Sequence, residues 1–324
     1  MQLFGRPTQE KIVFALAVGL CVVFAILLPG FLTSSNILNL LRSVSILGIL
    51  GIAMALVVIG RGIDLSLVAA MAVSVGWTLQ LAGSGMPLAE AMVIGILFAL
   101  LVGAVNGYLI AYVEIPAIFA TLAMGTAVYG FGKYFLFRLD VLYLPESQRY
   151  LLWLGQGYLF GVPAPIYVFA AVSIAAWALL AYTRSGRYLR AVGDNLPAAR
   201  ITGVPVRPII VLTYMTSSLI GFVAGMVTAA SVASMNTRVA NSTYVYDVIL
   251  VVVLGGIGLS GGRGGVRNVI VGTLLIGVLL NGMTIMDIQY TVQNVIKSAI
   301  LLSAIVIDTL LNPRDEQTAQ QGDI

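Results

Sequence analysis

The stretch LAEAMVIGILFALLVGAVNGYLIAY, residues 88–112, is an almost uninterrupted apolar run whose single charged residue is Glu90. A helix needs roughly 20 consecutive apolar residues to cross a hydrocarbon core about 30 Å thick. The run does not alternate between apolar and polar residues, as the strand of a membrane barrel would. It therefore predicts a transmembrane helix.

Runs of the same kind, bounded by turn signals, recur along the chain. The expected spans are 12–28, 43–60, 66–83, 88–112, 117–137, 164–183, 208–231, 245–260, 268–284 and 292–311. The first span follows Arg6 and Lys11, as a signal peptide would. However, Pro29 comes after it in place of a small-x-small cleavage site, so we interpret it as a transmembrane helix. We expect an all-α polytopic membrane protein with about ten transmembrane helices, forming one domain over 1–311, with a flexible cytoplasmic tail over 312–324.

The composition excludes several classes of function. The chain of 324 residues is 60% hydrophobic and only 9% charged, with a mean hydropathy of +1.02, so its main solvent is lipid. It has no histidine and a single cysteine, Cys21, which argues against a metal site and against a disulfide within the chain. No nucleophile–base arrangement or clustered acidic pair is present, so we expect no catalytic residues. The basic residues cluster in a few loops, which is not the pattern of a nucleic-acid-binding protein.

The basic residues set the expected orientation in a bacterial inner membrane, with both termini in the cytoplasm. Eleven fall on the cytoplasmic side in this arrangement: Arg6, Lys11, Arg61, Arg184, Arg187, Arg190, Arg200, Arg207, Arg263, Arg267 and Arg314. Six fall outside or in the outer half of a helix: Arg42, Lys133, Arg138, Arg149, Arg238 and Lys297. This excess agrees with the positive-inside rule.

Two connections are long. The segment 138–163 is rich in tyrosine and tryptophan, which settle at a membrane interface, and we expect it to be a periplasmic loop. It suits either a docking surface or an aromatic belt without a partner. The segment 184–207 is the long cytoplasmic connection and carries five arginines, so it is the expected contact for a cytoplasmic partner.

That cytoplasmic segment contains AVGDNLPAARITGV, residues 191–204. Asp194 or Asn195 can cap a helix whose first turn tolerates a proline, and Gly203 can end it. A helix of about two turns is marginal alone in water and needs a surface to pack against. Small Ala198 and Ala199 would allow close approach, and Arg200 can pair with acidic groups.

The Ala-Ala-x-x-x-Gly spacing of 198–203 resembles the cytoplasmic coupling loop of ABC importer permeases, although Pro197 stands where that loop usually has glutamate. GIDLS at 62–66 resembles the signature of the ribose, xylose and galactose permeases, as does VVLGGIGLSGG at 252–262. The chain departs from that group at 67–69, where LVA replaces the usual Val-Gly-Ser, which affects the expected substrate preference more than the fold. The resemblance covers nearly the whole chain.

The resemblance implies a type II importer fold and a permease subunit that translocates a monosaccharide or small polyol. It also implies a second permease subunit, identical or related, a periplasmic solute-binding protein and a cytoplasmic ABC ATPase that holds ATP and magnesium. This chain has no phosphate-binding loop of its own, since its one Gly-Lys pair, Gly132-Lys133, is followed by tyrosine. The alternatives are a branched-chain amino-acid permease or an ion-coupled transporter in which Asp64, Glu90 and Asp247 are ion sites.

A set of polar and glycine residues within the helices is expected on the translocation path or its gate: Asp64, Ser66, Asn106, Asp247, Gly255, Gly256 and Asn281. Each has a structural reading beside the functional one. Asp64 could cap the third helix and pair with Arg61, because an unpaired aspartate in a membrane costs a few kcal/mol. Asp247 could cap the eighth helix. The glycines could make a flexible gate or a tight helix crossing, and the asparagines could bind sugar hydroxyls or neighbouring helices.

Overall fold

The computed structural model describes residues 9–311, which are mostly helical. The predicted flexible tail, 312–324, lies outside the described residues. The α-helices are α1 (Gln9–Leu27), α2 (Ser34–Ile59), α3 (Leu67–Gly83), α4 (Leu88–Ala111), α5 (Ala117–Phe131), α6 (Leu152–Gln156), α7 (Ala164–Tyr182), α8 (Arg184–Asp194), α9 (Leu196–Ile201), α10 (Val206–Val232), α11 (Tyr244–Leu254), α12 (Val266–Ile285) and α13 (Tyr290–Leu311). The other elements are the short π-helix η1 (Gly132–Leu136), the 3-10 helices η2 (Glu146–Leu151) and η3 (Thr237–Asn241), and the strands β1 (Val141–Tyr143), β2 (Tyr158–Leu159), β3 (Val162–Pro163) and β4 (Ser234–Asn236).

Six helices of the described part are long and apolar enough to cross a membrane: α1, α2, α4, α7, α10 and α12. Three further apolar helices, in α3, α11 and α13, are shorter. Helix length and composition therefore identify six membrane spans in the described part and not the expected number of about ten. The chain is a polytopic membrane protein with at least these six spans. One reason is that α11 ends at Leu254, before the glycines that the predicted span 245–260 included.

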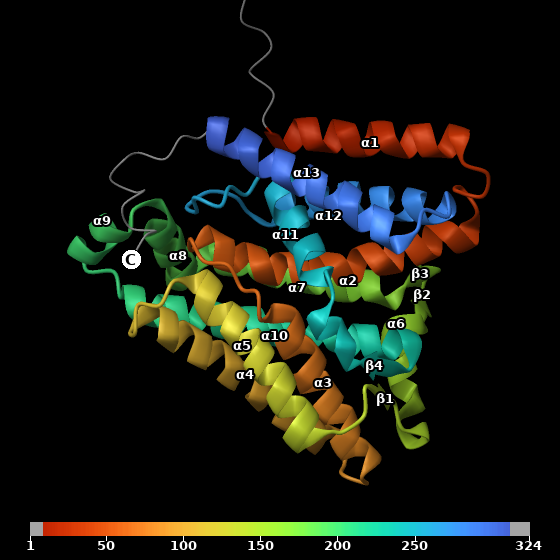
Figure 1. The fold of residues 1–324 in the computed structure, drawn as a ribbon, viewed down its shortest axis with the longest axis horizontal. Coiled ribbons are helices and arrows are strands. Elements are labelled where there is room, and N and C mark those ends of the chain that lie inside the picture. The colour runs from red at the N-terminus through yellow and green to blue at the C-terminus, as the bar shows by residue number, and fades with distance from the viewer. Residues whose placement is uncertain (1–8, 312–324) are drawn as a thin grey trace, which may run out of the picture.

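Helix α2 forms the centre of the molecule. Its residues from Leu47 to Ile59 are buried on all sides, which is the pattern of a helix enclosed by other helices and not facing lipid. Figure 1 shows α2, α7 and α10 in the middle, with α1, α12 and α13 on one side and α3, α4 and α5 on the other. The main hydrophobic cluster joins α2 to residues of α7, α10, α11 and α12.

Helices α4 and α10 cross closely because α4 carries small residues along one stripe: Gly95, Ala99, Gly103 and Gly107. A Cβ added at Gly103 would lie 2.5 Å from the carbonyl oxygen of Tyr214, and one at Gly107 would lie 2.5 Å from the Cα of Val211. Small residues at this spacing are the usual means by which membrane helices bring their backbones together. The crossing places Asn106 of α4 beside Ser66, in the loop between α2 and α3.

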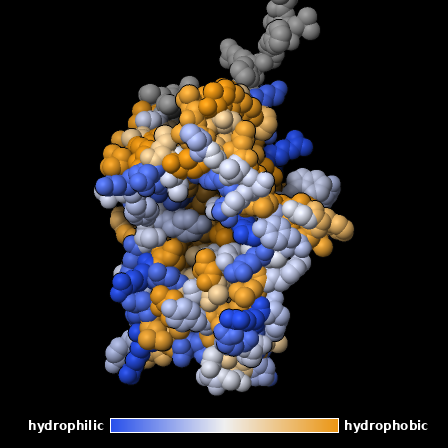
Figure 2. All heavy atoms as spheres, turned by 90° about the vertical axis from the view of Figure 1, so that its right-hand side faces the viewer, coloured by the Kyte–Doolittle hydropathy of each residue, from blue (hydrophilic) through white to orange (hydrophobic). Residues whose placement is uncertain are grey.

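The two long connections lie at opposite ends of the helices. Figure 1 shows α8 and α9 at the left end and the strands with α6 at the right end. There β1 pairs with β4 and β2 with β3, both antiparallel. Seen from that side in Figure 2, the lower part is largely hydrophilic or intermediate, while hydrophobic residues gather at the top. Such a surface suits contact with water.

A cluster of charges ties this end together. The carboxylate of Asp140 accepts a hydrogen bond from Lys133 and forms an ion pair of 2.6 Å with Arg238. These contacts, with the hydrogen bond from Lys133 as the largest contribution, lower the pKa of Asp140. The cluster joins the end of α5 to the segment after β4.

Candidate functional site

The break between α2 and α3 holds a buried aspartate. The Oδ1 atom of Asp64 accepts hydrogen bonds from the backbone N–H of Ser66 at 3.1 Å and from its hydroxyl at 2.6 Å. Its Oδ2 atom accepts from the Ser217 hydroxyl at 3.1 Å. Asp64, Ser66 and Ser217 are all completely buried. The carboxyl group is thus held by neutral donors in the interior, where satisfied hydrogen bonds are required.

Of the two structural expectations about Asp64, one is met in part and one is wrong. Ser66, and not Asp64, occupies the N-cap position of α3, but the Asp64 carboxylate does accept a backbone N–H at the start of that helix. The guanidinium of Arg61 does not pair with Asp64 but donates to the carbonyl oxygens of Gly193 and Asp194, each at 2.7 Å. Arg61 itself has a φ of 66°, a left-handed conformation that is uncommon for residues other than glycine.

Neighbouring helices complete this group. The Asn106 amide of α4 donates to the Ser66 hydroxyl at 2.7 Å, so the two predicted site residues do meet. The Thr121 hydroxyl of α5 accepts from the N–H of Leu65 at 3.1 Å, and the Tyr214 hydroxyl of α10 lies 3.4 Å from a carbonyl of the same loop. Sequence reasoning missed Thr121, Tyr214 and Ser217, because hydroxyl residues in apolar helices carry no distinctive signal. We call Asp64, Ser66, Asn106, Thr121 and Ser217 the Asp64 cluster.

The Asp64 cluster is not fully satisfied within the described residues. The buried Oδ1 atom of Asn106 and the buried hydroxyl of Ser218, next to Ser217, have no hydrogen-bond partner there. Unpaired buried polar atoms are uncommon in folded proteins and need an explanation. The Asn106 atom lies in the group around Asp64, because the amide nitrogen of the same side chain donates to Ser66.

Replacing Asp64 by asparagine is expected to be tolerated better than replacing it by leucine. Leucine leaves three donors without an acceptor, at about 1–3 kcal/mol for each buried unsatisfied group, whereas asparagine keeps one acceptor oxygen. The thermal unfolding midpoint of the purified protein in detergent measures the difference. Equal midpoints for the two variants would contradict a hydrogen-bonding role.

The predicted coupling helix forms as α9. The Asn195 side chain accepts a hydrogen bond from the N–H of Ala198 at 2.9 Å and so caps it, while Asp194 belongs to the end of α8. Gly203, with a φ of +81°, follows the helix and ends it. Ala198 and Arg200 are exposed, but Ala199 is buried against the chain itself.

One exposed feature of α9 escaped sequence reasoning. The side chain of Ile201 is 87% exposed at the end of the molecule away from the strands. In the sequence it is one apolar residue among many, so no pattern singles it out.

The glycines that follow α11 make a tight crossing. A Cβ at Gly255 would lie 2.3 Å from the carbonyl oxygen of Asn268, and the Asn268 amide donates to the Gly255 carbonyl at 2.8 Å. Gly256 has a φ of +91°, a conformation that a side chain would strain. These contacts fasten the start of α12 to the end of α11.

The remaining predicted path residues lie elsewhere, each with a partner. Asp247 of α11 forms a buried ion pair with Lys297 of α13, at 2.7 and 3.0 Å from the two carboxylate oxygens. Asn281 of α12 and Asn36 of α2 exchange two side-chain hydrogen bonds of 2.8 and 2.9 Å. The predicted set therefore does not gather in one place.

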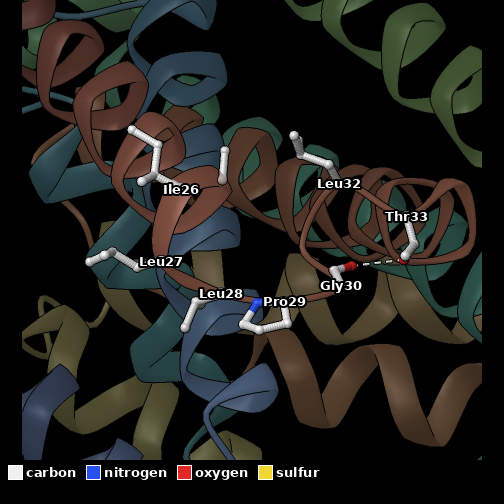
Figure 3. Close-up of a pocket in the computed structure, with 8 residues that line it drawn as sticks. Ile26, Leu27, Leu28, Pro29, Gly30, Leu32 and Thr33 are labelled. Atoms are coloured by element: carbon white, nitrogen blue, oxygen red, sulfur yellow. Dashed lines mark hydrogen bonds between the residues drawn. The ribbon is translucent and has the colours of Figure 1, made fainter.

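A shallow surface depression lies at the turn between α1 and α2. Figure 3 shows its lining, in which the Thr33 hydroxyl donates to the Gly30 carbonyl at 2.7 Å. The other lining residues are Ala25, Ile26, Leu27, Leu28, Pro29 and Leu32. It contains none of the predicted site residues and no charged group, so it is not the candidate site.

The chain matches known proteins over most of its length. The family described as "Branched-chain amino acid transport system / permease component" matches residues 36–305. The chain is 31% identical to the ribose import permease protein RbsC of Escherichia coli K12, over 93% of each chain. It is 33% identical to the protein of that name in Bacillus subtilis 168, over 89% of each chain.

A third relative transports a different sugar. The L-arabinose transport system permease protein AraH of Escherichia coli K12 is 30% identical over 94% of this chain and 92% of its own. None of the solved structures matches this chain. The extent of these matches shows that the chain belongs to the family of ABC transport-system permease components described as "Branched-chain amino acid transport system / permease component".

Proposed function

We propose that this chain is the membrane-spanning permease subunit of an ATP-driven importer and that it translocates a monosaccharide or related small polyol. The observation that carries the proposal is the full-length similarity to permeases named for ribose and arabinose import. The family description also names branched-chain amino acids, but the relatives named for ribose and arabinose import favour a sugar over that alternative. For an ion-coupled transporter, Asp247 is a poor ion site, because its carboxylate is occupied by Lys297.

The proposed topology has ten spans in a bacterial inner membrane and both termini in the cytoplasm. The shorter apolar helices α3, α11 and α13, together with α5 and the π-helix η1 that continues it, would be the four spans beyond the six long helices. Figure 1 supports this arrangement, because α8 and α9 of the segment 184–207 lie at one end and the strands of the segment 138–163 lie at the other. A cytoplasmic and a periplasmic segment must lie at opposite ends in this way.

The proposed partners follow from this arrangement. A cytoplasmic ABC ATPase with ATP and magnesium would contact α9, and a periplasmic solute-binding protein would dock on the opposite end. A second permease subunit, the same chain or a related one, would complete the path. The Asp64 cluster would lie on or beside that path, with the coupling residues Asp194, Asn195, Ala198, Ala199, Arg200 and Gly203 at the ATPase.

The exposed face of α9 gives the sharpest test of ATPase contact. We expect the double variant Ala198→Glu, Ile201→Glu to retain its fold, because both side chains are exposed. It should weaken association with the ATPase at least about tenfold, since charges replace apolar contacts at an interface. Co-purification of the cognate ATPase with the membrane-inserted chain measures this.

The control variant is Tyr143→Glu, at a residue that is 73% exposed at the opposite end. It should retain the ATPase. Failure of the wild-type chain to retain any ATPase would sink the importer assignment. Uptake of labelled ribose, arabinose and leucine by the assembled system then separates sugar import from amino-acid import.

A further inference from the structure

Three breaks in helical structure meet at the end of the molecule that carries α8 and α9. They are the loop after α2 at Arg61, the end of α8 at Gly193 and Asp194, and the glycine segment after α11. These parts are far apart in sequence, since Arg61 and Gly193 are separated by 132 residues. Their contacts are direct, and we call this meeting point the Arg61 junction.

Arg61 binds the end of α8. Its Nε atom donates to the carbonyl oxygen of Gly193 and its Nη2 atom to that of Asp194, both at 2.7 Å. The last carbonyls of a helix lack partners within the helix and carry partial negative charge, so a guanidinium is well suited to them. Its planar donors also fix the direction of α8 relative to α2.

The glycine segment joins the same point through its backbone. The N–H of Gly262 donates to the carbonyl oxygen of Ile59, the last residue of α2, at 2.9 Å. A Cβ at Gly261 would lie 2.5 Å from the Cγ atom of Arg61. A Cβ at Gly193 would lie 1.8 Å from the Ile59 carbonyl oxygen. The contact leaves little space for one part to slide without the others.

The Arg61 junction leads to both functional regions. On one side, α8 continues through Asn195 into α9, the proposed ATPase contact. On the other, Arg61 stands three positions before Asp64, whose carboxylate reaches Ser217 of α10. The glycine segment leads through Gly255 to Asn268 at the start of α12. A displacement of α8 would therefore act on the loop that holds the Asp64 cluster and on the crossing of α11 and α12.

We propose that Arg61 is a positioning residue for energy coupling, which links movement of α8 and α9 to the break between α2 and α3. The inference rests on the proposed function, since it assumes an ATPase at α9. The physical basis is that the link consists of charge-assisted hydrogen bonds to main-chain atoms, which are among the stronger hydrogen bonds, and of glycine contacts that leave the main chain little room to slide. Arg61 touches neither ATP nor solute in this scheme.

The experiment compares Arg61→Gln and Arg61→Lys in the importer reconstituted into liposomes with its ATPase and binding protein. Solute uptake and ATP hydrolysis are measured in the same vesicles. Removing the forked donor should lower solute taken up per ATP hydrolysed about tenfold in Arg61→Gln, the change that a loss of about 1.4 kcal/mol of coupling gives. Arg61→Lys keeps the charge but not the forked donor, so its ratio of solute uptake to ATP hydrolysis should lie between those of Arg61→Gln and the wild type. Retention of the ATPase on co-purification should be unchanged.

The control is Arg267→Gln, which removes an exposed cation of α12 at the same end of the molecule. It should keep the wild-type ratio of uptake to hydrolysis. A wild-type ratio in Arg61→Gln overturns the inference, as does a parallel fall in ATPase retention, which would make Arg61 a structural residue only. Both outcomes differ from failure of the proposed function, in which the wild-type chain itself would neither retain the ATPase nor take up solute.

Discussion

The Gly193→Ala variant is expected to lose at least about nine-tenths of its ATP-driven uptake, although it adds only one methyl group. The new Cβ would lie 1.8 Å from the carbonyl oxygen of Ile59 and 2.5 Å from the backbone nitrogen of Gly262. Both neighbours are main-chain atoms, so no side-chain rotation relieves the overlap. Overpacking typically costs about 1–3 kcal/mol, roughly 5- to 150-fold in an equilibrium, and we expect this overlap with two main-chain atoms to lie above the lower end of that range.

The measurement is initial uptake rate, with the thermal unfolding midpoint recorded on the same preparation. Gly130→Ala is the matched control, because a Cβ at that position in α5 meets nothing within 4 Å. We expect Gly130→Ala to behave as wild type in both assays. Wild-type uptake by Gly193→Ala would show that α8 can move away from α2 without consequence, and the Arg61 junction would then carry no coupling.

The second large effect is expected at the ion pair between Asp247 and Lys297. The two side chains are 9% and 7% exposed, and the Lys297 ammonium also lies 5.5 Å from the centre of the Tyr290 ring. Removing one partner of a buried pair leaves an uncompensated charge and typically costs about 3–5 kcal/mol. Lys297→Met should therefore lower the unfolding midpoint of the purified protein strongly.

The double variant Asp247→Leu, Lys297→Met distinguishes a structural pair from a residue of the solute path. Replacing both charges by apolar groups is often neutral in stability, so the double variant should unfold near the wild-type midpoint. If it is stable and still transports, Asp247 joins α11 to α13 and has no place on the path. If it is stable but inactive, the path assignment of Asp247 is supported. A double variant as unstable as Lys297→Met would show that the two charges do not compensate each other.

Local features of this protein could be predicted from the sequence. The cap of α9 by Asn195 and its end at Gly203 depend on residues within a few positions of one another, and the structure has both. The apolar runs located the long helices, but their ends were less accurate. Helix α2 begins at Ser34, well before the predicted residue 43, with Thr33 as its N-cap, and the polar Arg42 within it donates to the Tyr158 hydroxyl at 2.6 Å. That contact crosses a separation of 116 residues and leaves no local signal.

The partners of the candidate site could not be predicted in the same way. Arg61 is near Asp64 in sequence, and attraction between opposite charges made it the expected partner. In the structure, Arg61 binds main-chain carbonyls of α8, whereas Asp64 binds Ser217, 153 residues away. The choice depends on which parts of the chain lie beside each residue, the end of α8 beside Arg61 and α10 beside Asp64, and both are properties of the packed molecule.

The sequence by itself determined that this protein lies in a membrane and that a short capped helix forms within the long connection 184–207. Hydrophobic run length and helix capping act over a few residues or within one helix, so composition and spacing are enough for both. Only the tertiary structure decided which polar groups meet inside the membrane domain, and that the ends of α2 and α8 meet the glycine segment. Each of those contacts joins distant parts of the chain, and its geometry is set by how closely the backbones of separate helices can approach.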